Sequence, residues 1–508
     1  MKTMRYLVGA GLLSAVTLSF MGCQPRPLLG PGDGMDAQGR FDSRGKSQAT
    51  RFEDGENEKG RPGRPQISGI DYKKELVITD LSVVEDPYRT TGNGPWTFAY
   101  LMTQMAGGQD VDRFVKDWLN TWMADQYVNG DPVKARKKVK ELILDPWPRI
   151  PGTDLLDLTK SPFRLLAITN RLDVRKVGDI GEGRFVFGVV DRNPGPFGEA
   201  VPFTVIFEYG ITLQMGDPKL VKVDLSRDND DVDKRMKAVR NWAAKWHALS
   251  ALPYGPQFNA GLQEITDTFA RAGANPKKPN GSALNQLRTN EIQLSLMEFT
   301  FGPQGPSIPF DQIKPWEMRE FHVTRSGLKP VPVALTPHLA LNGSAELANY
   351  INKNEKDILK DRHVMPAPML AGTALVPGAF NSTAQPNDPP LIWNAPGIRN
   401  SEARFKFAQN TCSGCHLIES GFEQDTNGGF IAGQAFMHVR PRLAGQESQL
   451  SPFMKGVTTK DAVTGKPRTV NDLDRRIDDM MFLVGKSRTS KYYNTATEME
   501  NPFPAKVH

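Results

Sequence analysis

Apolar positions early in the chain recur with a helical period. Between residues 111 and 123 they return at steps of three and four, which predicts an amphipathic helix packed on a core. They are Val111, Phe114, Val115, Trp118, Leu119, Trp122 and Met123. A second helix is predicted from Asp131-Pro132, because Asp caps a helix N-terminus well and proline suits the first turn.

The period changes from residue 163 onward. Apolar, β-branched and aromatic residues dominate 163–169, 184–190 and 203–207, and clusters of Gly, Asp, Asn and Pro separate these runs. Such runs predict three strands, and the short links between them favour an antiparallel meander. A shorter apolar run at 75–78 predicts one more strand ahead of them.

Helical spacing returns further along the chain, at 231–252, 256–272 and about 344–361. Residues around 292–296 and 319–324 alternate between apolar and polar types, which is typical of paired strands. Strands and helices that occur in separate runs indicate an α+β fold rather than alternating βαβ units.

Composition divides the folded chain into two regions. Residues 67–362 are expected to form the α+β region, built from antiparallel strands and amphipathic helices as one domain or two subdomains. The passage 363–397 is rich in proline and glycine and predicts a linker. We expect a small all-α domain over 398–490 and a C-terminal tail over 491–508.

Two helices support the all-α prediction. The first is expected to be capped by Ser401, and its inner face carries Phe405, Ala408, Cys412 and Cys415 at steps of three and four. The second begins at Asn471, where acidic residues follow in the first turn and favour the positive end of the helix dipole. Its apolar stripe contains Leu473, Ile477, Met480, Met481 and Val484.

The first 23 residues have the pattern of an export signal. Lys2 and Arg5 form a basic head, residues 6–21 are apolar, and Gly22 precedes Cys23. The segment resembles a bacterial lipoprotein signal, although Phe20 and Met21 depart from that family's usual residues. The resemblance implies a lipid on Cys23 and an anchor in the bacterial cell envelope, and Gln24 implies the outer membrane, with the chain facing the periplasm or the surface.

The segment after Cys23 and the overall charge limit the remaining options. Residues 24–66 have few aliphatic side chains, so they are expected to form a disordered tether. No later segment has the roughly 20 apolar residues of a membrane-spanning helix. The formal net charge is only +6, and the basic residues are scattered among acidic ones, so nucleic-acid binding is not indicated.

Cysteine usage supplies the strongest chemical signal in the chain. The three cysteines are Cys23, Cys412 and Cys415, and the last two belong to the run Cys412-Ser413-Gly414-Cys415-His416. C-x-x-C-H is the attachment sequence of covalent haem, in which two thiols bind the porphyrin and the histidine coordinates iron. Residues 395–490 resemble a class I c-type cytochrome domain. The resemblance implies one covalent haem c on Cys412 and Cys415, with His416 as the proximal iron ligand.

The sixth iron ligand has three candidate states. His438 follows His416 by 22 positions, a feasible loop length, and ranks first. Met454 ranks second, and a vacant position third; a second histidine lowers the haem potential, a methionine raises it, and a vacancy admits small ligands. Arg440 or Arg442 is a candidate partner for a haem propionate.

The sequence is compatible with three functions. The first is an anchored c-type cytochrome that transfers electrons to or from an unidentified redox partner. The second is a haem peroxidase or oxidase with a substrate pocket between the domains. The third is a lipoprotein binding or scaffold module whose Cys412 and Cys415 form a disulfide. Residues 170–187 resemble uncharacterised bacterial exported proteins, which implies no activity.

Overall fold

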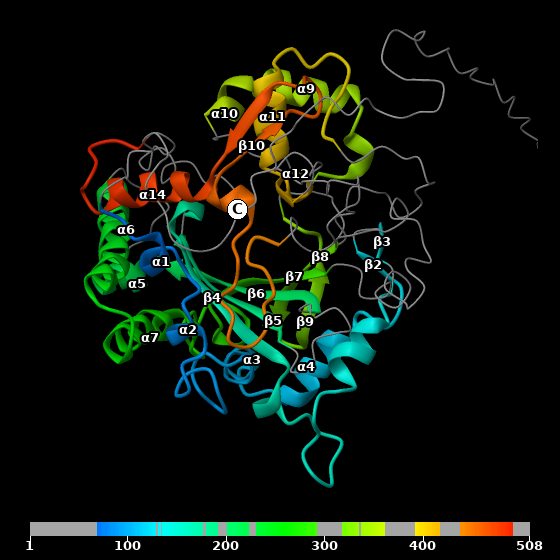
Figure 1. The fold of residues 1–508 in the computed structure, drawn as a ribbon, viewed down its shortest axis with the longest axis vertical. Helices are drawn as coiled ribbons and strands as arrows, with labels where there is room; N and C mark the ends of the chain where they lie inside the picture. The colour runs from blue at the N-terminus through cyan, green and yellow to red at the C-terminus, as the bar shows by residue number, and fades with distance from the viewer. Residues whose placement is uncertain are drawn as a thin grey trace, which may run out of the picture. The chain divides into compact units, whose positions relative to one another are not determined.

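A seven-stranded antiparallel sheet forms the centre of the fold (Figure 1). The computed structural model describes residues 69–490 except 129–130, 134, 176–178, 191–200, 223–229, 292–316, 335–336, 361–391 and 417–436. The sheet has the order β1-β4-β5-β6-β7-β8-β9. The strands are β1 (Val77–Ile78), β4 (Phe163–Arg171), β5 (Asp179–Val189), β6 (Val201–Thr212), β7 (Leu284–Glu291), β8 (Glu317–Thr324) and β9 (Gly327–Val331).

The two faces of the sheet differ in chemistry, because successive side chains of a strand point to opposite sides. On one face Phe207 lies opposite Phe185 of β5 and Leu287 of β7. On the other face Arg184 lies opposite Glu208 of β6. We call this second side the polar face; its members include Thr169, Arg171, Arg184, Glu208, Arg288 and Glu320.

Helices cover the apolar face. Phe98 of α3 stacks on Phe163 with ring centroids 4.5 Å apart, and Phe269 of α7 lies 5.5 Å from Tyr209. Gly183 makes room for this packing, because a Cβ at that position would overlap the Phe269 ring. In Figure 1, α3, α4 and α7 lie below the strands. The helices of this region are α1 (Tyr72–Glu75), α2 (Leu81–Val84), α3 (Phe98–Ala106), α4 (Val111–Asn120), α5 (Leu213–Gly216), α6 (Asp230–Ala248) and α7 (Pro256–Ala270).

The α+β prediction for the N-terminal region is confirmed, including the antiparallel strands predicted at 163–169, 184–190 and 203–207 and the main helices. The strand predicted around 292–296 lies outside the described residues. The predicted helix at Asp131 is wrong. Asp131–Val133 is strand β3, which pairs with β2 (Gln126–Val128), and the next helical turn is Lys140–Leu144. Asn129-Gly130 in the sequence is typical of a tight hairpin turn, and that signal outweighs the favourable helix start of Asp-Pro.

The C-terminal part mixes helices with a hairpin, so the expected all-α form is not confirmed. Strands β10 (Val457–Lys460) and β11 (Pro467–Val470) pair antiparallel between its last two helices. Apolar side chains of this part, Phe453 and Met480 among them, join the same hydrophobic core as the sheet. The helices are α9 (Ala345–Lys353), α10 (Glu355–Leu359), α11 (Ser401–Gln409), α12 (Cys412–His416), α13 (Pro452–Lys455) and α14 (Asp472–Leu483).

Buried ion pairs attach α14 to the end of β4. Both guanidinium nitrogens Nη1 and Nη2 of Arg175 donate to the Asp479 carboxylate, at 2.6 and 2.7 Å. Arg475 of the same helix donates to Asp173 at 2.8 Å. The side chains of Arg175 and Asp479 are at most 1% exposed, so neither charge has water as an alternative partner.

We expect Arg175→Met to lower the free energy of unfolding by about 3–5 kcal/mol, because it leaves the Asp479 carboxylate buried without its cation. Urea unfolding followed by circular dichroism measures this. Arg113→Met is the control: its pair with Asp117 is largely exposed and should contribute less than about 1 kcal/mol. The double variant Arg175→Met/Asp479→Leu should recover most of the lost free energy of unfolding. An Arg175→Met protein as stable as the wild type would contradict the role of the Arg175–Asp479 pair in holding α14.

Candidate functional site

The C-x-x-C-H run forms the short helix α12, which follows α11 almost directly. Thr411 caps it: its Oγ1 accepts from the Gly414 N–H at 3.0 Å and donates to the Ala408 carbonyl at 2.7 Å. The backbone N–H of Cys415 donates to the Thr411 carbonyl at 2.9 Å. These bonds hold both cysteines and His416 on one turn at the end of α11.

Gly414 is required by the close approach of α12 to α11. A Cβ at this position would overlap the Ala408 carbonyl oxygen and lie 3.0 Å from Thr411 Oγ1. The obstacle at Ala408 is backbone, which cannot move aside as a flexible side chain can. The packing of α12 against α11 therefore requires glycine at position 414.

The two thiols of α12 are buried, and neither is in a disulfide. Cys412 and Cys415 are both 0% exposed. Burial raises the pKa of the Cys415 thiol well above its usual value, and the nearby Asp472 raises it further. Cys415 is therefore a neutral thiol at neutral pH, and its Sγ lies 3.1 Å from Nε2 of His438.

His438 comes from a separate segment and faces α12. Its ring centroid lies 4.2 Å from that of His416, at an interplanar angle of 40°. On the other side its Nδ1 lies 2.9 Å from Oγ of the buried Ser451, which fixes the ring orientation. One ligand atom each from Cys415, His416 and His438 lies within 4.8 Å of the others, so the three side chains form a potential metal-binding group.

A cavity of about 70 Å³ lies between this group and the polar face of the sheet. By the usual size of a water site, it has room for a few water molecules. Four arginines contribute to its walls: Arg171, Arg184 and Arg288 from the sheet and Arg476 from α14. Met454 of α13, 2% exposed, lines the same cavity.

The arginines at the cavity are paired with buried acids across the sheet. Arg184 lies 2.6 Å from Glu182, and Arg288 lies 3.0 Å from Glu320 and 3.3 Å from Glu208. Burial lowers the pKa of Arg171 to about 9, and repulsion from Arg476 contributes. Arg171 is nevertheless paired with Asp173 at 2.8 Å, and Arg476 with Asp472 at 2.5 Å, so both arginines already have a buried acidic partner.

The structure brings together the candidate haem-attachment and iron-ligand residues of the C-terminal part, namely Cys412, Cys415, His416, His438 and Met454. Cys23 lies outside the described residues. Arg442 is engaged elsewhere, with Glu85 and with the Leu165 carbonyl at 3.2 Å, and Arg440 does not line the cavity. The structure therefore places neither of the two arginines at this cavity, where a propionate partner is expected.

Sequence reasoning missed the four cavity arginines and Ser451. Arg171, Arg184 and Arg288 occupy alternate positions of strands whose other positions are apolar, a pattern typical of a solvent-facing side. The sequence contains no signal that this side is covered. Ser451 precedes Pro452 in what the sequence presents as an ordinary helix start.

We expect Gly414→Ala to displace α12 and to lower the free energy of unfolding by about 1–3 kcal/mol, as overpacking does elsewhere. Reaction of Cys412 and Cys415 with a thiol reagent, on protein made without haem attachment, should become faster. Gly261→Ala in α7 is the control, because its nearest obstacle is a flexible Leu249 methyl. Equal thiol reactivity in wild type and Gly414→Ala would contradict this reading of the turn.

Comparisons with known proteins give no match for this chain. No family model matches the sequence, and neither does any curated protein or solved structure. The C-x-x-C-H motif and the geometry of the site are therefore the basis on which a function can be proposed.

Proposed function

We propose that the chain attaches one haem c through thioether bonds to Cys412 and Cys415 and transfers single electrons. The observation that carries the proposal is the geometry of α12. Two buried thiols that are not in a disulfide stand with His416 on one helical turn. A second imidazole, His438, lies beside that of His416 and lines the same cavity. Each thioether forms when one S–H adds across one vinyl group, so attachment needs no oxidant.

Bound haem iron would supply the one-electron couple, and the protein would set its ligands and charge. His416 is the proximal ligand in this arrangement. His438 is favoured over Met454 as the second, because Ser451 holds its Nδ1 and leaves Nε2 toward α12. Arg171 and Arg476 line the cavity beside His416, each already paired with an acid, and would contribute positive potential there. A filled sixth position favours electron transfer over peroxide chemistry, which needs an open one.

The room at the site sets a condition on this proposal. The described walls enclose about 70 Å³, which is less than a porphyrin occupies. His416 and His438 must therefore separate beyond their present centroid distance of 4.2 Å to stand on opposite sides of a haem.

A second candidate is a mononuclear metal centre. The small size of the site favours a metal ion, because donor atoms of Cys415, His416 and His438 already lie within 4.8 Å of one another. One Cys and two His with a weak Met is the ligand set of blue-copper electron-transfer sites, and Met454 lines the same cavity. In this arrangement Cys412 is not a ligand.

The proposal also places the chain in the bacterial envelope, held at the outer membrane through a lipid on Cys23. The signal-like segment before Cys23 supports this, and so does the requirement that bacterial haem attachment takes place outside the cytoplasm. Among the described residues, no helix is sufficiently long and apolar to span a bilayer.

Single cysteine variants separate the two candidates. If haem is attached through both thiols, Cys412→Ser and Cys415→Ser should each weaken the haem-stained band on a denaturing gel, and the double variant should abolish it. If a metal ion is bound instead, Cys415→Ser should lose it while Cys412→Ser retains it, as measured by mass spectrometry of metal content. A colourless, metal-free wild type from a host with working haem attachment would refute both.

We expect His438→Ala to convert a low-spin, six-coordinate visible spectrum into a largely high-spin one, because the iron loses its second axial ligand. Met454→Leu is the matched control and should leave the spectrum unchanged. The reverse result, a change with Met454→Leu alone, would assign the methionine as the ligand. Reduced-minus-oxidised spectra of both variants provide the measurement.

A further inference from the structure

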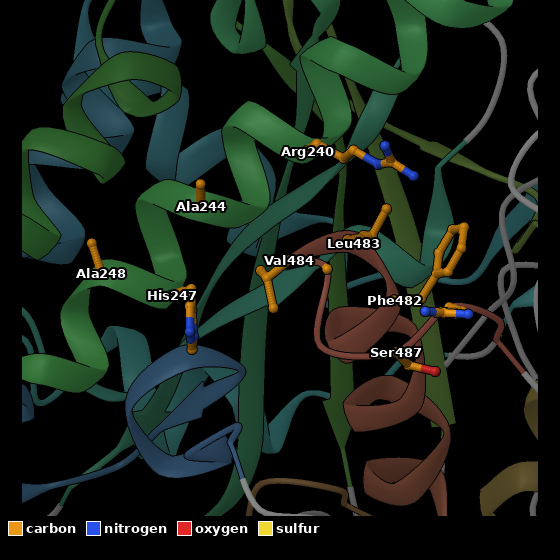
Figure 2. Close-up of a pocket in the computed structure, with 10 residues that line it drawn as sticks. Arg240, Ala244, His247, Ala248, Phe482, Leu483, Val484 and Ser487 are labelled. Atoms are coloured by element: carbon orange, nitrogen blue, oxygen red, sulfur yellow. The ribbon is translucent and has the colours of Figure 1, made fainter.

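A second, larger cavity lies away from α12, between α6 and the end of α14 (Figure 2). Its volume is about 640 Å³, within the range of small-molecule sites in proteins. In Figure 2 the α6 side presents Arg240, Ala244 and His247, and the opposite side presents Phe482 and Val484. It shares no lining residue with the cavity beside His416.

Two arginines of this cavity have no acidic partner in the part of the chain that the structure describes. Arg240 and Arg488 both line the cavity and are exposed. Neither forms an ion pair with a described carboxylate, whereas Arg475 and Arg476 of α14 do. The Arg240 guanidinium lies 5.7 Å from the Phe482 ring centroid, which draws it toward the cavity wall.

A histidine with a fixed orientation adds a third polar group. Nδ1 of His247 lies 2.8 Å from Oε2 of Glu75, a carboxylate that is 0% exposed. Burial raises the pKa of Glu75, and the hydrogen bond from His247 opposes this shift. Because Nδ1 is engaged with Glu75, Nε2 is the ring nitrogen without that contact, and His247 is one of the residues that line the cavity.

Apart from Ser487, the rest of the lining is apolar, and small residues create its space. Ala244 and Ala248 follow Arg240 at successive turns of α6, so one face of the helix carries a cation and then two methyl groups. Phe482 and Val484 supply apolar surface on the opposite side. An apolar lining with a few convergent polar groups is typical of a ligand site.

We propose that this cavity binds a small organic anion with an apolar body, such as an aromatic carboxylate. Arg240 and Arg488 compensate the negative charge, the imidazole Nε2 of His247 completes the polar contacts, and the body of the ligand rests between Ala244 and Phe482. This site is independent of the proposed function, because none of these residues belongs to the haem or metal site.

Isothermal titration of the full-length protein with 2-naphthoate tests the proposal. We expect saturable binding with a dissociation constant on the order of 100 µM. Arg240→Gln and Arg488→Gln should each weaken binding about threefold to fivefold, as expected for partly exposed charges. Ala244→Phe fills the cavity without a change of charge and should abolish binding.

Three controls make the test decisive. The uncharged analogue 2-naphthamide should bind at least about fivefold more weakly. Arg325→Gln removes an exposed arginine outside the cavity and should leave binding unchanged. All variants should keep the wild-type visible spectrum and unfolding midpoint. Absent binding, equal binding of the amide, or binding insensitive to both Arg240→Gln and Ala244→Phe would overturn the proposal, whatever the result at α12.

Discussion

The fold depends on the pairing of buried charges over the polar face of the sheet. An antiparallel sheet with one apolar face can leave its other face in water, but here Arg171, Arg184 and Glu208 are all buried. Buried charges are tolerated only when they are paired and hydrogen-bonded. Part of that pairing comes from α14, through Arg175 with Asp479 and Arg475 with Asp173. The C-terminal segment is therefore held on the sheet by electrostatic complementarity as much as by apolar packing.

The pairing of buried charges on the polar face also determines the surroundings of the candidate site. The C-terminal part places His416 of α12 over a wall of arginines, and each of these arginines is paired with a buried acid. Helix α14 also reaches the second cavity, because Arg476 lies near its start and Phe482 near its end. The sheet thus provides an extended charged surface, and one helix borders both places where a ligand could bind.

The sequence predicts what depends on local pattern and spacing. The strands β4, β5 and β6, the helix α4, and the grouping of His416 with His438 all follow from periodicity or from a motif with a feasible loop. What it could not predict depends on which surfaces meet. Arg288 has the pattern of a solvent-facing strand residue until the C-terminal segment covers it, and Arg442 pairs with Glu85, which lies 357 positions earlier in the chain. The hairpin β10–β11 likewise has weak local signals, since short strands gain their stability mainly from packing.

Two observations about α12 favour different occupants of the site. The short distance between the His416 and His438 rings suits a metal ion held together with Cys415, but such a centre gives Cys412 no role. A metal centre also gives no reason for the close contact at Gly414, which holds Cys412 and Cys415 on one buried turn. Haem attachment uses both thiols and the next residue together. Haem binding would require the two imidazoles to separate, whereas the placement of the two thiols is set by the backbone of α12. The backbone geometry that holds both thiols on one buried turn is therefore the feature that distinguishes the two candidates, and haem attachment is the candidate that uses it.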